Sequence, residues 1–108
     1  MVEVRFSSVF KRRLKQLSKR YRHIKQDIDP ILTELQLGNF IGDQIVGTNY
    51  TVIKIRAKNS DIPTGKRGGY RLVYQIATPK LVFLLLIYVK SDRSDISLDD
   101  IKTAINDL

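Results

Sequence analysis

The sequence predicts an α+β fold: a small antiparallel sheet, mixed through its N-terminal strand, packs against an N-terminal helical hairpin, and a short helix follows at the C-terminal end. Two stretches of helical periodicity lie between residues 7 and 38, three stretches with strand character lie between 50 and 93, and an amphipathic stretch covers 97–108. The expected order of elements is β-α-α-β-β-β-α. A chain of 108 residues can build one hydrophobic core but not two, so a single domain, residues 1–108, is expected.

The first strand and helix are predicted from residues 2–22. Residues 2–6 alternate apolar and polar side chains, and Ser7 or Ser8 can then cap a helix. The apolar stripe of this helix consists of Phe10, Leu14, Leu17 and Tyr21. Its opposite face carries the cations Lys11, Arg12, Arg13, Lys15, Lys19, Arg20 and Arg22. A solvated helix surface would explain them, but the scarcity of acids favours a phosphate-binding patch that includes Lys11, Arg12 and Lys15.

A second helix is predicted by an apolar stripe of Ile24, Ile28, Ile31 and Leu35. It is expected to end near Gly38, a residue suited to the position just after a helix. Pro30 interrupts it, so that either the helix bends there or Asp29 caps a new one. A bent but continuous helix is the expectation. Residues 39–49, punctuated by glycine, predict a loop.

Three strands and a helix are predicted in the second half of the chain. Residues 50–58 alternate, which places Lys54, Arg56 and Lys58 on one side of a strand. In the next strand Arg71 falls on the side opposite its aromatic and aliphatic neighbours. The run 81–89 is apolar throughout, as in a strand covered on both faces. Finally, Ser97 resembles the first residue of a capping box and predicts a short helix.

Composition excludes several classes of function. The chain has no Cys and one His, which excludes disulfides, zinc–thiolate sites, a cysteine nucleophile and a histidine-dependent triad within the chain. No secretory signal is visible and the apolar run is too short to span a bilayer, so a cytoplasmic protein without a membrane partner is expected. The net charge of +8 and the pI of about 9.9 indicate a polyanionic partner. No motif calls for a metal or another cofactor.

The cations of the strands suggest a binding groove. If strand register brings Lys54, Arg56, Arg71 and Lys90 together, with Tyr88 nearby, one side of the sheet can hold phosphates and stack a base, as single-stranded RNA requires. Such a groove also permits RNA cleavage without a metal, because the 2′-hydroxyl is itself the nucleophile. The protein then holds the in-line geometry and stabilises the charge on phosphorus, for which arginine is well suited.

The segments Lys66–Tyr74 and Tyr88–Asp92, in this order, resemble the RelE/ParE toxin superfamily, and in particular its HigB-like RelE branch. The resemblance extends over nearly the whole chain. It implies a toxin of a type II toxin–antitoxin system that cuts mRNA in the ribosome and leaves a 2′,3′-cyclic phosphate and a 5′-hydroxyl. The implied partners are the ribosome with its mRNA and a cognate antitoxin, with operator DNA contacted only through the antitoxin.

The resemblance also implies roles for particular residues. Arg71 corresponds to the phosphate-clamping arginine of RelE, and Lys54 and Arg56 correspond to basic positions on the preceding strand, with Lys54 as candidate base. Lys90 or Arg93 would replace a catalytic arginine. The remaining implied phosphate contacts are Lys58, Lys66 and Arg67.

Three positions depart from the family pattern: Val52, Ser91 and Ser97 stand where RelE has catalytic side chains. For this reason two alternatives remain open at the level of sequence. One is a ParE-like poison of DNA gyrase that carries out no RNA chemistry. The other is an RNA-binding toxin homologue that has lost catalysis.

Overall fold

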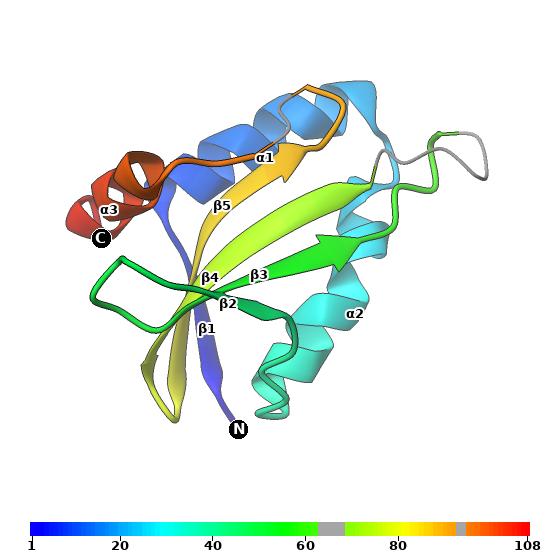
Figure 1. Ribbon diagram of the computed structural model, residues 1–108. Coiled ribbons are helices and arrows are strands. Elements are labelled where there is room, and N and C mark those ends of the chain that lie inside the picture. The colour runs from blue at the N-terminus through cyan, green and yellow to red at the C-terminus, as the bar shows by residue number, and fades with distance from the viewer. Residues whose placement is uncertain (63–68, 93–94) are drawn as a thin grey trace.

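A computed structural model of the protein describes residues 1–62, 69–92 and 95–108 (Figure 1). The described elements are β1 (Glu3–Phe6), α1 (Ser8–Arg20), α2 (Ile24–Gln36), β2 (Asp43–Ile45), β3 (Val52–Ala57), β4 (Tyr70–Thr78), β5 (Leu81–Val89) and α3 (Leu98–Asn106). The predicted α+β class and the order β-α-α-β-β-β-α are confirmed, with the short strand β2 as an addition. Among the described helices, none combines the length and the apolar character needed to cross a membrane.

The sheet has the strand order β1-β5-β4-β3-β2. β1 runs parallel to β5, and the other neighbours are antiparallel. The prediction of a loop over the whole of residues 39–49 is wrong, because β2 pairs with the edge of β3. Three residues are too few to show a strand periodicity. The pairing brings the backbone at Gly42 so close to β3 that a Cβ atom there would lie 2.6 Å from the Lys54 carbonyl oxygen.

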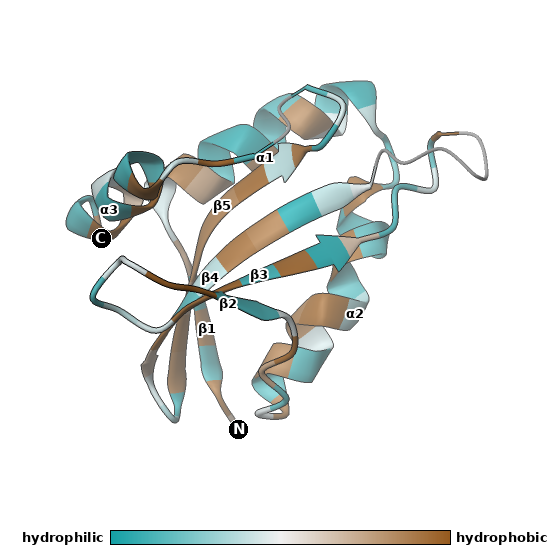
Figure 2. Ribbon diagram, in the orientation of Figure 1, coloured by the Kyte–Doolittle hydropathy of each residue, from teal (hydrophilic) through white to brown (hydrophobic). Residues whose placement is uncertain are grey.

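The two faces of the sheet have separate cores. Helices α1 and α2 cover one face (Figure 1), where Phe10, Ile28, Tyr70 and Leu72 belong to one buried cluster. On the other face a smaller cluster joins Val52, Val73, Leu86, Tyr88, Ile101 and Ala104, so that α3 covers only part of this face. Figure 2 shows the apolar length of β5, while hydrophilic residues interrupt β3 and β4. β5 is thus covered on both faces, as its sequence predicted.

Hydrogen bonds at the helix ends confirm the predicted caps. The Ser7 hydroxyl accepts from the Phe10 N–H at 2.9 Å and donates to the Leu85 carbonyl at 2.7 Å, which ties the start of α1 to β5. Ser97 and Asp100 form the predicted capping box of α3. α2 is one continuous helix that passes through Pro30, as expected.

Candidate anion-binding site on the sheet

Three side chains form a row across neighbouring strands of the sheet. Arg56 of β3 lies opposite Arg71 of β4, and Arg71 lies opposite Tyr88 of β5. Directly paired residues on neighbouring strands project from the same face, so the three side chains share one face. Lys54, two residues before Arg56, projects from that face as well. We call Lys54, Arg56 and Arg71 the cationic sheet face. The sequence alone could not show whether the strand register brings these cations together. The structure shows that they share one face of the sheet.

Arg71 is the most deeply placed of these cations. Only 8% of its surface is exposed. Its Nη1 donates two long hydrogen bonds, to the carbonyl oxygens of Gly69 at 3.4 Å and Tyr70 at 3.3 Å. Burial lowers the pKa of Arg71, and the nearby charge of Arg56 lowers it further. Within the described residues no carboxylate forms an ion pair with Arg71.

This arrangement costs folding energy. Like charges placed directly opposite each other in a sheet are destabilising, and a buried charge without a counter-ion is more costly still. An arginine nevertheless keeps its charge at any physiological pH. An anion that bonds to both guanidinium groups would offset this cost.

Glycine is required at the start of β4 to allow this packing. A Cβ atom at residue 69 would lie 2.5 Å from the carbonyl oxygen of Ala57, far inside van der Waals contact. The absence of a side chain lets β4 approach β3 where Arg71 meets Arg56. Three of the residues predicted to bind or cleave RNA lie outside the described residues: Lys66, Arg67 and Arg93.

Lys54 has acidic neighbours. Its Nζ lies 3.7 Å from Oδ1 of Asp95, and it stands opposite Asp43 in the register of β2 and β3. The pKa of Asp95 is lowered, mainly because its carboxylate accepts the Ile96 N–H and also because Lys54 is close. Asp95 therefore places a negative charge at the border of the cationic sheet face.

Two further predicted cations flank the row. Lys58 is exposed and directly follows β3, whereas Lys90 directly follows β5. The Lys90 N–H donates to the Gly69 carbonyl at 3.4 Å, the same oxygen that accepts from Arg71. Lys90 is thus anchored at the end of the sheet that holds Arg71.

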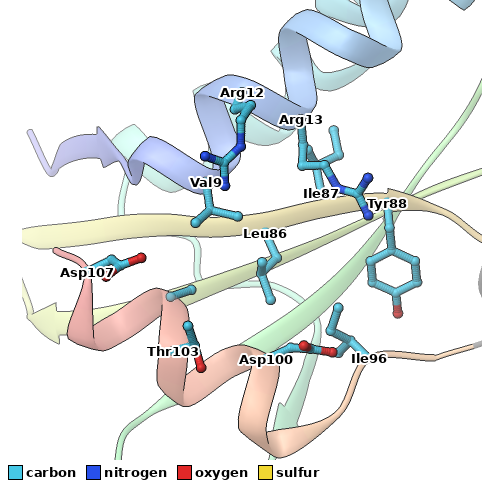
Figure 3. A pocket seen from close by; sticks show the side chains of 11 residues that line it. Val9, Arg12, Arg13, Leu86, Ile87, Tyr88, Ile96, Asp100, Thr103 and Asp107 are labelled. Carbon is cyan, nitrogen blue, oxygen red and sulfur yellow. The ribbon is translucent and has the colours of Figure 1, made fainter.

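The cations of α1 do not form one patch with the sheet. Lys11 and Lys15 line a hollow that also involves Lys25 of α2, and no residue of the cationic sheet face lines it. Arg12, together with Arg13, lines a different cavity between α1, β5 and α3 (Figure 3). Tyr88 belongs to this second cavity and also to the arginine row, so it links the two.

Two of the three positions that depart from the RelE pattern have structural roles here. Val52, the first residue of β3, is fully buried, and Ser97 caps α3. Ser91 is exposed in the turn after β5. No three His, Asp or Glu side chains in the described parts of the chain are arranged to hold a metal ion.

Sequence reasoning missed the contacts that fix the segment after β3. Asp61 accepts hydrogen bonds from the backbone N–H of His23 at 2.9 Å and pairs with its Nδ1 at 2.6 Å. Asp27 accepts from the Ser60 N–H at 2.9 Å. His23 therefore helps to hold residues 60–61 against the start of α2. No sequence pattern signals such pairs, because the partners are more than thirty residues apart.

Comparison with protein-family models and with curated proteins finds no match to this chain. The resemblance to RelE/ParE toxins therefore depends on the segments quoted above.

Proposed function

We propose that this protein is a toxin of the RelE/ParE type that inhibits translation as a ribosome-dependent mRNA endoribonuclease. The observation that carries the proposal is the pair Arg56 and Arg71, held on one face of the sheet with no carboxylate bonded to Arg71 among the described residues. A phosphodiester is an anion that can engage both guanidinium groups at once. The strongly basic net charge of +8 favours a nucleic-acid substrate over a small acid.

The proposed reaction uses the RNA's own nucleophile. The 2′-oxygen bonds to phosphorus while the bond from phosphorus to the 5′-oxygen breaks, which leaves a 2′,3′-cyclic phosphate and a 5′-hydroxyl. Arg71 and Arg56 stabilise the additional negative charge that the phosphorane carries in the transition state. The 2′ proton leaves to a base, and a proton is returned to the 5′-oxygen.

Lys54 is the candidate for proton transfer. A protonated lysine beside the carboxylate of Asp95 can donate a proton to the departing 5′-oxygen, which makes Lys54 better suited as the acid than as the base. Lys90 and Lys58, at the ends of their strands, are placed to hold flanking phosphates.

The proposal includes the partners that such a toxin requires. These are the ribosome with its mRNA and a cognate antitoxin, in the cytoplasm, with operator DNA bound only through the antitoxin. An acidic antitoxin segment would complement the cationic sheet face and occupy the phosphate position.

The test compares the chain with an Arg71→Ala variant. Induced expression should stop growth, and primer extension should map new 5′ ends within translated messages. Arg71→Ala should relieve both effects, because loss of a charge-assisted contact to the transition state costs tens-fold or more in rate. Arg22→Ala, which removes an exposed arginine between α1 and α2, serves as control. Undiminished toxicity and cleavage in Arg71→Ala would contradict the proposal.

A second candidate is a gyrase poison of the ParE type. It is favoured by the structural use of Val52 and Ser97, which occupy positions that are catalytic in RelE. Purified protein that inhibits supercoiling by gyrase, while leaving mRNA intact in translating extracts, would select this candidate. Expression without any effect on growth would instead indicate an RNA-binding homologue that has lost catalysis.

A further inference from the structure

The cavity between α1, β5 and α3 has two oppositely charged walls. Its volume is about 270 Å³. Arg12 and Arg13 of α1 form one wall, and Thr103 and Asp107 of α3 form the facing wall, with Leu86 of β5 between them (Figure 3). The walls are thus cationic on one side and acidic on the other, above an apolar floor.

Three charged side chains of the cavity have no ion-pair partner among the described residues: Arg12, Arg13 and Asp107. The guanidinium groups of Arg12 and Arg13 form no ion pair with any residue of the described ranges, although carboxylates face them across the cavity. The Asp107 carboxylate likewise has no ion-pair partner there. Asp100, which also lines the cavity, is engaged differently, since it accepts the Ser97 N–H at 3.3 Å.

These features describe a ligand of mixed character. It should carry an anionic group for the arginines, a flat apolar body for the floor, and N–H donors for the Asp107 carboxylate and the Thr103 hydroxyl. A nucleotide has all three. The cavity volume is just below the roughly 300 Å³ at which small-molecule sites usually begin, which suits one base better than a folded peptide segment.

Tyr88 connects this cavity to the cationic sheet face. It lies opposite Arg71 in the β4–β5 register and also lines the cavity. Figure 3 shows the guanidinium of Arg13 directed towards Tyr88. An RNA strand whose phosphate is held by Arg56 and Arg71 can therefore place a neighbouring nucleotide beside Tyr88.

We propose that this cavity is a nucleotide subsite that receives the base next to the phosphate held by Arg56 and Arg71. The inference deepens the proposed function and rests on it for the identity of the ligand as RNA. It also predicts a preference among the bases. A carboxylate accepts two N–H groups from the edge of guanine, but uracil has no amino group to offer, so guanine should bind best and uracil worst.

The test is a titration of the purified full-length chain with GMP, UMP and inorganic phosphate, followed by amide chemical shifts. GMP should perturb residues of α1 and α3 and bind about tenfold more tightly than UMP. Asp107→Asn should remove this preference, whereas Arg13→Gln should weaken both nucleotides about tenfold. Asp29→Asn and Arg22→Gln, exposed residues that line neither cavity, are the matched controls and should change neither affinity.

The outcomes separate this inference from the proposed function. Equal binding of GMP, UMP and phosphate would show an anion site only and overturn the subsite. The absence of chemical-shift changes in α1 and α3 at millimolar GMP would also overturn the subsite, and it would favour a protein segment as the occupant of the cavity. In either case, toxicity that depends on Arg71 would still support the nuclease. Conversely, guanine-selective binding would support the nucleotide subsite even if the Arg71→Ala variant were fully toxic. Full toxicity of that variant would contradict the proposed nuclease function.

Discussion

Arg56 and Arg71 stand opposite each other on adjacent antiparallel strands, so two guanidinium groups share one face of the sheet. Arg71 is buried there, without a carboxylate partner in the described part of the chain. A fold optimised for stability alone would place an apolar or acidic residue at one of the two positions. The pair therefore supports the proposed binding of an anion, and this proposal leads to measurable consequences.

Replacement of Arg71 by methionine should stabilise the protein and abolish its activity. Arg71→Met keeps an unbranched side chain of similar reach and removes the like-charge contact and the buried charge. The free energy of unfolding should rise by about 1 kcal/mol, measured by urea denaturation with an unchanged slope. The exposed control Arg22→Met should stay within about 0.5 kcal/mol of the parent protein. A clear loss of stability in Arg71→Met would show that the arginine serves the fold.

Removal of the charge at Asp95 should strengthen anion binding. The carboxylate lies 3.7 Å from Lys54 Nζ at the border of the cationic sheet face. Asp95→Asn should raise the affinity for single-stranded RNA roughly threefold at low salt, and less at high salt, because the pair is exposed and screened. Asp99→Asn makes the same change in net charge on the first turn of α3 and should have a smaller effect. Equal gains in the two variants would indicate a nonspecific charge effect.

A methyl group at residue 69 should displace Arg71. In Gly69→Ala the added Cβ would meet the Ala57 carbonyl oxygen at 2.5 Å, so β4 must move away from β3 at its first residue. The carbonyl of Gly69 accepts hydrogen bonds from both Arg71 and Lys90, so these cations move with it. We expect a loss of about 1–3 kcal/mol in the free energy of unfolding and a larger proportional loss of RNA cleavage. Unaltered cleavage would mean that the position of Arg71 is not critical.

Tyr74 should make stability sensitive to alkaline pH. Its hydroxyl donates to the Ile41 carbonyl at 2.5 Å, and burial raises its pKa from 10.0 to about 12. Because the folded protein holds this proton more tightly than the unfolded chain, the contribution to stability is complete below pH 10 and is lost as pH rises towards 12.

The Tyr74→Phe variant tests this dependence. At neutral pH it should be about 1 kcal/mol less stable, because a hydrogen bond is lost. The difference from the parent protein should shrink as the pH is raised above 10, since phenylalanine does not ionise. Free energies of unfolding measured from pH 7 to 11 provide the comparison, and a constant difference would contradict the assignment.

The sequence predicted the elements whose side chains repeat with a clear period. The stripes of α1 and α2, the alternation in β3 and the apolar run of β5 each extend over enough residues to be read without a structure. The same alternation placed Lys54 and Arg56 on one side of their strand. Caps were predictable too, because Ser7, Ser97 and Asp100 act on neighbouring backbone groups.

The features that could not be predicted from the sequence depend on contacts between residues far apart in the chain. The sequence could not show that Arg56 pairs with Arg71, because register is set by the whole sheet. It could not separate Lys11 and Lys15 from Arg12, since their different surroundings come from α2, β5 and α3. Strand β2 was missed because three residues at a sheet edge carry no period. The Lys54–Asp95 contact was missed because it joins residues 41 positions apart in the numbering.

The parallel pairing of β1 with β5 has a consequence for biosynthesis. Residues 3–6 find their backbone partners only at 81–84, and the Ser7 hydroxyl reaches Leu85 across 78 positions. During translation the backbone of β1 therefore lacks its sheet partner until β5 has emerged from the ribosome. The same late strand supplies Tyr88 to the arginine row. A nascent chain therefore carries an incomplete arginine row until the residues of β5 have been made.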